Sequence, residues 1–241
     1  MNSIWSKTSE PVGFEPLKES KSADVLIIGG GLTGLLCAYM LKNAGVDCIL
    51  AEAGRICSGI TRNTTAKITF AHGLLYDKLI KRFGQEPARL YLEAQLRAAE
   101  HYACLCKEIP CDYESKDSYV YSLDDRKKIE REIEALNRLG VPAEFSETPL
   151  LPIRTAGAVC VRNQAQFHPL KFAFALAKEL PVYENTKVQE LLPGKAITQY
   201  GEIAFRKAIV ATHFPILNKH GGYFLKLYQH RSYVLALDGA P

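Results

Sequence analysis

"ADVLIIGGGLTGL", residues Ala23–Leu35, is the stretch that decides the fold. Its first seven residues, Ala23–Gly29, are a short apolar run with β-branched residues that ends in glycines, which predicts a buried parallel strand. Leu32–Gly45 has the pattern of a helix that ends at a glycine. Val46–Ala53 predicts a second buried strand. Together these segments predict a βαβ unit of about 30 residues.

The glycines of this unit follow the G-x-G-x-x-G pattern at Gly29, Gly31 and Gly34. The first glycine makes the tight turn, the second lets the backbone approach a pyrophosphate, and the third lets the helix pack closely on the strand. The helix N-terminus offers N–H groups and a positive dipole end to phosphates. The pattern therefore predicts a dinucleotide site, and the alternative is a glycine-rich turn in an unrelated α/β protein.

Glu52 lies at the end of the second predicted strand. Its carboxylate can accept hydrogen bonds from both hydroxyls of a ribose, and it would repel a 2′-phosphate, so NADP is disfavoured. The alternative is a surface acid at a strand end. The same βαβ unit can hold FAD or NAD, and the segments that follow it distinguish between the two.

Three further segments carry a resemblance to a known family: "TRNTTAKITFAHGLLYDKL" from Thr61, "NQAQFHPLKF" from Asn163 and "ATHFP" from Ala211. With the glycine-rich unit, they resemble FAD-dependent oxidoreductases of the D-amino-acid oxidase and glycine oxidase superfamily. More narrowly, they resemble a bacterial branch whose members often carry a C-terminal Rieske iron–sulfur domain. The resemblance extends from Trp5 onward.

The resemblance implies an α/β fold, with a Rossmann-like FAD-binding domain and an interleaved, incomplete α+β substrate domain. The chain stops directly after a strand-like run, Arg231–Leu237, so we expect an N-terminal piece of a longer polypeptide. Arg231 falls where the family's substrate-domain sheet resumes.

The expected divisions are an N-terminal arm (1–22), a first FAD-binding segment (23–84), a helical segment and start of the substrate domain (85–150), a second FAD-binding segment (151–218), and a return to the substrate domain (219–241). Further strands are expected at 181–191, 196–205 and 206–214, and helices at 74–83, 87–109, 124–139 and 168–180.

Position by position, the resemblance also implies the cofactor contacts. The glycine-rich loop would hold the pyrophosphate, the end of the second strand the adenosine ribose, and the Thr-rich segment the ribityl chain and flavin ring. Arg55 would lie near the adenine or ribose. A valine backbone would pair with the adenine edge, and an Ala-Thr strand end would return beside the pyrophosphate. The expected residues are Gly29, Gly31, Leu32, Thr33, Gly34, Glu52, Ala53, Arg55, Ser58, Thr61, Thr64, Thr65, Ala66, Lys67, Val188, Ala211 and Thr212. For Val188 the alternative is an ordinary core valine, and for Thr212 a strand-end cap.

Lys67 and His72 are the candidates for catalysis. A cation at Lys67 near the flavin would stabilise the negative charge of its reduced form, and His72 would contact substrate or flavin. The alternatives are a solvent-facing lysine and a histidine at a helix start. Tyr119 and Tyr121 share one face of a predicted strand, where they would line a substrate pocket or pack on a neighbouring strand.

The remaining histidines and the cysteines suggest no second chemistry. His168 precedes a proline at a helix start, so we interpret it as a capping or packing residue; His213 is a weaker candidate for a cofactor contact. The histidines are too far apart in sequence to predict a metal site. The seven cysteines form no C-x-x-C pair, which favours reduced thiols.

Composition excludes several classes of partner. The net charge is +4, and the basic residues are scattered among acids, which does not predict a nucleic-acid surface. No apolar run reaches the ~18 residues of a membrane span. The polar start of the chain has no signal-peptide core, so a cytoplasmic location is the default expectation.

These observations predict an FAD-dependent oxidoreductase that oxidises an amine or amino acid by hydride transfer to flavin N5. An iron–sulfur domain of the same polypeptide is an expected electron acceptor. The alternatives are an NAD-linked dehydrogenase and a truncated nucleotide-binding scaffold without activity. The family's last cofactor element would lie beyond Pro241, so this chain alone is expected to bind FAD weakly or not at all, and to be inactive.

Overall fold

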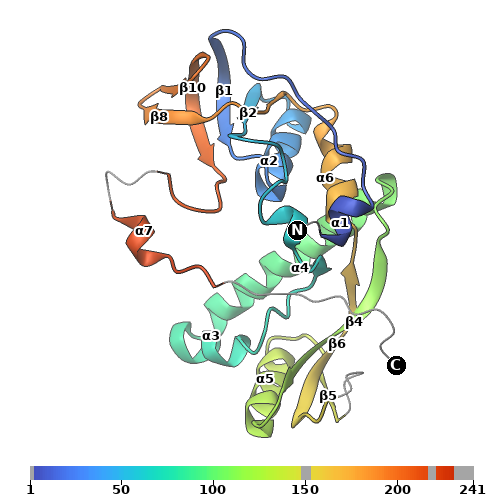
Figure 1. Cartoon of the computed structure of the whole chain (residues 1–241). Helices are drawn as coiled ribbons and strands as arrows, with labels where there is room; N and C mark the ends of the chain where they lie inside the picture. The colour runs from blue at the N-terminus through green and yellow to red at the C-terminus, as the bar shows by residue number, and fades with distance from the viewer. Residues whose placement is uncertain (1–2, 148–152, 217–220, 231–241) are drawn as a thin grey trace. The chain divides into compact units, whose positions relative to one another are not determined.

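The computed structural model describes residues 3–147, 153–216 and 221–230 (Figure 1). The chain forms two compact units, each built from two stretches. Unit 1 combines Met1–Pro11 with Thr61–Ala175, and unit 2 combines Val12–Ile60 with Leu176–Pro241. The strand expected at Arg231–Leu237, with Arg231 itself, lies outside the described residues. The domain divisions inferred from the sequence remain a prediction.

Unit 2 contains the predicted βαβ unit, which the structure confirms as β1 (Lys21–Ile28), α2 (Leu32–Asn43) and β2 (Cys48–Ala51). β1 lies inside a six-stranded sheet of order β7-β2-β1-β10-β9-β8. It pairs in parallel with β2 on one side and with β10 (Gly201–Val210) on the other. The glycine-rich loop therefore leaves the sheet where three parallel strands end together, the edge at which open α/β sheets bind ligands.

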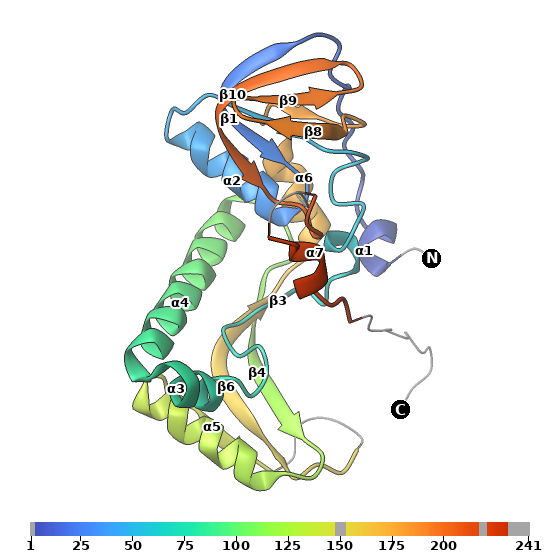
Figure 2. The same ribbon diagram turned by 90° about the vertical axis from the view of Figure 1, so that its left-hand side faces the viewer.

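The rest of this sheet differs from the sequence prediction. The segment 181–191 forms two short strands, β7 (Val182–Tyr183) and β8 (Val188–Leu192). The strands expected at 196–205 and 206–214 were divided wrongly. They form β9 (Lys195–Thr198) and the single long β10, and β9 lies between β10 and β8 (Figure 2). The chain reverses between Thr198 and Gly201, which are antiparallel partners, and Gly201 has a φ of +139°.

Alternating side chains of β1 and β2 are buried on opposite faces of this sheet. On one face, the Cys48 thiol lies 3.9 Å from the Ala38 carbonyl oxygen, so this face packs on α2. On the other face, Leu26 and Ile49 join an apolar cluster with Leu17, which comes from the segment before β1. Burial on both faces explains why these strands appear as continuous apolar runs.

Unit 1 is built around a second, mostly antiparallel arrangement. Its central strand β6 (Gly157–Gln166) pairs with β4 (Glu114–Ser122) along one edge. The short strands β3 (Lys67–Ile68) and β5 (Glu144–Ser146) pair with its other edge. The helical elements of unit 1 are α1 (Ile4–Lys7), the 3-10 turn η1 (Thr61–Asn63), α3 (Tyr76–Phe83), α4 (Gln85–Glu108), α5 (Arg126–Arg138) and α6 (Pro169–Ala177), the last extending into unit 2. A final short helix of unit 2 is α7 (Tyr223–Lys226).

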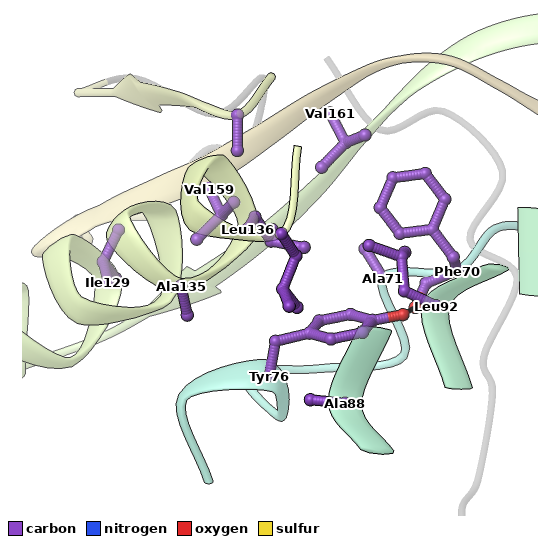
Figure 3. Packing of buried hydrophobic residues seen from close by; sticks show 12 residues of the cluster. Phe70, Ala71, Tyr76, Ala88, Leu92, Ile129, Ala135, Leu136, Val159 and Val161 are labelled. Atoms are coloured by element: carbon purple, nitrogen blue, oxygen red, sulfur yellow. Dashed lines mark hydrogen bonds between the residues drawn. The ribbon is translucent and has the colours of Figure 1, made fainter. Parts of the chain in front are cut away.

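The core of unit 1 lies between β6 and the helices α3, α4 and α5. Figure 3 shows the Tyr76 ring between Leu136 on α5 and Ala88 on α4. The Tyr76 hydroxyl donates a hydrogen bond to the Phe70 carbonyl oxygen at 2.9 Å, so its polar end is satisfied inside the core. Burial raises the pKa of this phenol well above its usual range.

A buried acid completes this core. Glu132 on α5 is 2 % exposed, and its carboxylate accepts hydrogen bonds from three backbone N–H groups at the start of α3. No side chain within α3 caps that end. The Glu132 carboxylate on α5 therefore takes the place of an N-cap side chain for α3 and interacts favourably with the dipole of that helix.

His168 has the capping and packing role predicted for it. Its Nδ1 accepts a hydrogen bond from the Lys171 N–H at 3.2 Å, and its Nε2 lies 2.9 Å from the Thr8 hydroxyl. The ring packs edge-on against Trp5, with centroids 5.1 Å apart. His168 therefore fixes the N-terminal helix α1 within unit 1.

Candidate functional site

The glycine-rich loop of unit 2 has the backbone geometry that its sequence predicts. Gly29 has a φ of +112°, and a Cβ built there would lie 2.8 Å from the Ala211 carbonyl oxygen. A Cβ at Gly34 would collide with the Gly29 carbonyl oxygen. Only glycine allows this tight turn and this approach of α2 to the loop.

The end of β10 lies beside this loop, as predicted. The Ala211 N–H donates a hydrogen bond to the Ile28 carbonyl oxygen at 2.8 Å, which extends the pairing of β1 and β10 by one residue. The Thr212 hydroxyl donates to the Phe214 carbonyl oxygen at 2.8 Å, so it stabilises the turn after the strand. A cofactor contact by Ala211 and Thr212 remains a prediction.

Glu52 is oriented toward the glycine-rich loop by its own hydrogen bonds. One carboxylate oxygen accepts from the Gly30 N–H at 2.7 Å and the other from the Gly54 N–H at 2.8 Å. Its backbone is held between the Tyr183 carbonyl oxygen and the Thr186 N–H. Each carboxylate oxygen retains acceptor capacity, so the group is oriented and can still accept hydrogen bonds from hydroxyls.

The loop after Glu52 rests on Glu184, which the sequence did not reveal as important. Glu184 is 2 % exposed, and its carboxylate accepts hydrogen bonds from Ile56 N–H at 2.8 Å and Phe14 N–H at 3.3 Å. Arg55 lies 3.8 Å away from it and is otherwise exposed. Arg55 thus neutralises a buried acid, while its predicted place near the adenine or ribose remains a prediction.

Other predicted cofactor residues of unit 2 differ in exposure. Thr33, Ala53 and Ser58 are exposed, and Leu32 is half-buried at the start of α2. The Val188 side chain packs against the apolar cluster of the sheet. It therefore has the structural role offered as the alternative, and an adenine contact by its backbone remains a prediction.

The Thr-rich segment of unit 1 is held in place by distant regions of that unit. The Trp5 indole N–H donates to the Thr64 carbonyl oxygen at 2.8 Å, and Thr61 is buried. Ala66 has a φ of +59°, a left-handed conformation that the sequence did not predict. Its carbonyl oxygen accepts from the Phe167 N–H at 3.3 Å, just before Lys67 pairs with Gln166.

This segment borders a hollow of about 650 Å³ that lies entirely within unit 1. Both catalytic candidates, Lys67 and His72, line it, together with the tyrosine pair Tyr119 and Tyr121. The complete lining is Thr64, Thr65, Lys67, Thr69, Ala71, His72, Gly73, Lys116, Asp117, Ser118, Tyr119, Val120, Tyr121, Gln164, Ala165 and Gln166. The structure thus brings residues from β3, β4 and β6 around one volume, which we name the unit-1 hollow.

His213, the weaker histidine candidate, is exposed after the end of β10. Within the described ranges, no group of three or more His, Cys, Asp or Glu side chains could hold a metal ion. Among the helices of those same ranges, none combines the length and apolar character of a membrane span.

Residues 24–241 match a family model described as FAD dependent oxidoreductase. The chain belongs to this family. FAD is the family's cofactor, and the glycine-rich loop of unit 2 fits it, because side chains at Gly29 or Gly34 would obstruct the turn from which phosphates are bound. This finding favours FAD over the NAD-linked alternative.

Two proteins and one solved structure are examples of what this chain resembles. The chain is 35 % identical over 246 residues to the "Putative Rieske 2Fe-2S iron-sulfur protein YhfW" of Bacillus subtilis, covering 97 % of this chain and 48 % of that protein. It is 27 % identical over 216 residues to the gamma-glutamylputrescine oxidoreductase of Escherichia coli, covering 82 % and 50 %. The structure of L-proline dehydrogenase from P. horikoshii superimposes with a TM-score of 0.64 at 20 % identity, covering 80 % of this chain and 53 % of that one.

This chain thus spans about half the length of the two relatives named above. The structural likeness supports the α/β fold predicted from the sequence, with the parallel sheet of unit 2 and the mainly antiparallel sheet of unit 1.

Proposed function

We propose that the whole protein is an FAD-dependent oxidoreductase that oxidises an amine or an amino acid. The observation that carries this proposal is the glycine-rich loop at the carboxyl edge of β1, with Glu52 oriented toward it by the Gly30 N–H. The family assignment supports FAD at this place. The similarity to gamma-glutamylputrescine oxidoreductase supports a substrate that bears an amine.

Each region of the chain has a distinct task in this proposal. The N-terminus of α2 and the loop before it hold the pyrophosphate, and Glu52 accepts hydrogen bonds from the adenosine ribose. FAD held there would accept a hydride at N5 from the carbon that bears the neutral amine, and the resulting iminium ion would lose a proton to water to give the imine. Lys67 and His72 line the unit-1 hollow, which would hold the substrate.

The electron acceptor is a separate element of the proposal. The name of the Bacillus subtilis relative supports an iron–sulfur domain in the same polypeptide as the acceptor. If so, substrate added without oxygen should bleach the flavin and then reduce the iron–sulfur centre of the whole protein. Flavin that is reoxidised only by oxygen would contradict this route.

The test of the main proposal has two readouts. The first is FAD binding, measured by the quenching of FAD fluorescence as protein is added, with Glu52→Gln as the test variant and Glu19→Gln, an exposed acid of the same unit, as its control. The second is loss of flavin absorbance when amines or amino acids are added without oxygen. A whole protein that takes up no FAD, or that reduces NAD without flavin, would contradict the proposal.

A further inference from the structure

We propose that Cys106 and Cys111 are a pair of thiols that a hydroperoxide converts to a disulfide, which fixes the end of α4 to the loop that follows it. Both are free thiols in the structure, and both belong to unit 1. Neither lines the unit-1 hollow. The inference goes beyond the proposed function, because it requires neither bound FAD nor a substrate.

The two thiols contact each other. The Cys106 S–H donates a hydrogen bond to the Cys111 sulfur. Cys111 is 1 % exposed and Cys106 is half-buried, so the pair lies at the edge of the protein interior. A disulfide needs sulfur atoms about 2 Å apart on Cβ atoms about 4 Å apart. Thiols that already touch can reach this geometry by small rotations of their side chains.

Contacts that do not involve the sulfur atoms also bring this face of α4 to Cys111. Tyr102 lies one helical turn before Cys106, on the same face of the helix. Its ring packs edge-on against Phe167, with centroids 5.6 Å apart. The next residue, His168, donates a hydrogen bond from its N–H to the Cys111 carbonyl oxygen at 2.7 Å. The start of α6 therefore holds both the helix face of Cys106 and the backbone of Cys111.

The surroundings of the pair keep it reduced until an oxidant arrives. Burial, followed by the hydrogen bond with Cys111, raises the pKa of Cys106 to about 12, and burial also raises the pKa of Cys111. Both groups are therefore protonated at neutral pH, and no repulsion between thiolates separates them. Because only a thiolate attacks an oxidant, the first step of the oxidation should be slow.

The oxidation consumes one hydroperoxide for each pair of thiols. One sulfur attacks the hydroperoxide as its thiolate, so that an S–O bond forms, the O–O bond breaks and the departing oxygen takes up a proton. The second thiol then attacks the sulfenic sulfur: the S–S bond forms, the S–O bond breaks, and hydroxide leaves with the thiol proton as water. Because the two sulfur atoms are already in contact, this second step should be faster than further oxidation of the sulfenic acid.

Cys104 provides an internal control. It is exposed and lies two positions before Cys106 on α4, so the two side chains point to different faces of the helix. Exposure alone predicts that Cys104 is the thiol lost to an oxidant. Contact between thiols predicts instead that Cys106 and Cys111 are lost together.

The test maps disulfides in the whole protein after treatment with hydrogen peroxide. Remaining thiols are blocked with N-ethylmaleimide in denaturant, and tryptic peptides are analysed by mass spectrometry without reduction. Trypsin cleaves after Lys107, so the disulfide should link the two peptides on either side of this cut. The link should persist in Cys104→Ser, and should be lost in Cys106→Ser and after reduction with dithiothreitol. Oxidation without linked peptides, or a link that depends on Cys104, would overturn the inference.

Hydrogen exchange tests whether the bond fixes the end of α4. In the oxidised protein, amides of the last turn of α4 should exchange more slowly than in the reduced protein. Cys106→Ser, treated with peroxide in the same way, should show no such change. Linked peptides with unchanged exchange would overturn this structural role. If Cys106→Ser does not fold, the comparison of oxidised with dithiothreitol-reduced Cys104→Ser decides both points.

Discussion

Replacement of Glu132 should destabilise unit 1 strongly, and the structure allows the effect to be worked out bond by bond. One oxygen accepts from the Leu75 and Tyr76 N–H groups at 2.8 and 2.7 Å, and the other accepts from the Asp77 N–H at 3.0 Å. The group is 2 % exposed, so water cannot easily replace it. Glu132→Ala leaves three donors at the start of α3 without this partner.

The expected loss is large for a single side chain. A buried donor left unsatisfied costs about 1–3 kcal/mol, and the lost interaction with the helix dipole adds roughly 0.3–1 kcal/mol. Partial hydration reduces the sum, so we expect Glu132→Ala to lower the free energy of unfolding by about 3–5 kcal/mol. Glu132→Gln retains one acceptor oxygen but turns an NH₂ group toward a backbone donor, so about 2–3 kcal/mol should be lost.

The assay combines urea unfolding with hydrogen exchange followed by mass spectrometry. Urea unfolding measures the loss of unfolding free energy. Hydrogen exchange shows which part of the chain is destabilised, because the α3 amides should lose protection before those of unit 2. Glu134→Gln is the matched control: it is the same substitution on the same helix at a less buried position, and it should change the free energy of unfolding by less than about 0.5 kcal/mol. If Glu132→Gln behaves like Glu134→Gln, the capping role is refuted.

Three further outcomes are expected. Gly34→Ala should abolish FAD binding or unfold unit 2, because its Cβ collides with a loop carbonyl, whereas Gly59→Ala meets no atom within 4 Å and should be tolerated in the same fluorescence titration. Glu184→Gln should weaken FAD binding about tenfold by loosening the loop after Glu52, and an unchanged affinity would exclude this positioning role. Burial, followed by the charge of Lys171, lowers the pKa of His168 below its ordinary value of 6.5. The stabilisation that neutral His168 provides is therefore complete above pH 6.5. It is lost as the pH falls through the lowered pKa that His168 has in the folded protein, because protonation removes the Nδ1 acceptor. Between about pH 7.5 and pH 5.5, unfolding free energies should fall less in His168→Asn than in the parent protein, and equal slopes would exclude this origin.

The sequence predicted correctly those parts of the fold that depend on residues close to one another in the chain. The βαβ unit was predictable because its strands are apolar on both faces and its glycines are required by backbone geometry at Gly29 and Gly34. The position of His168 before a proline likewise predicted its cap. β10 was divided wrongly because a run of three exposed residues, 206–208, interrupts its pattern at the point of division, and nothing local shows that β1 pairs along its whole length.

The features that organise the candidate site were hidden because their partners are remote in sequence. Glu184 binds the Ile56 N–H 128 residues away, and Glu132 binds the Tyr76 N–H 56 residues away. In the sequence, each is an ordinary acid in a charged segment. Only the fold shows that both are buried acceptors for backbone groups and not surface charges.

The same reasoning decides how Lys67 should be interpreted. From its sequence neighbours alone, Lys67 can be a solvent-facing lysine or a site cation, and the Thr-rich residues around it, which suit a solvent-facing turn poorly, favour the site cation. Its role depends on whether the acids that the fold brings near are available, and Asp117 and Glu114 are both occupied by other partners.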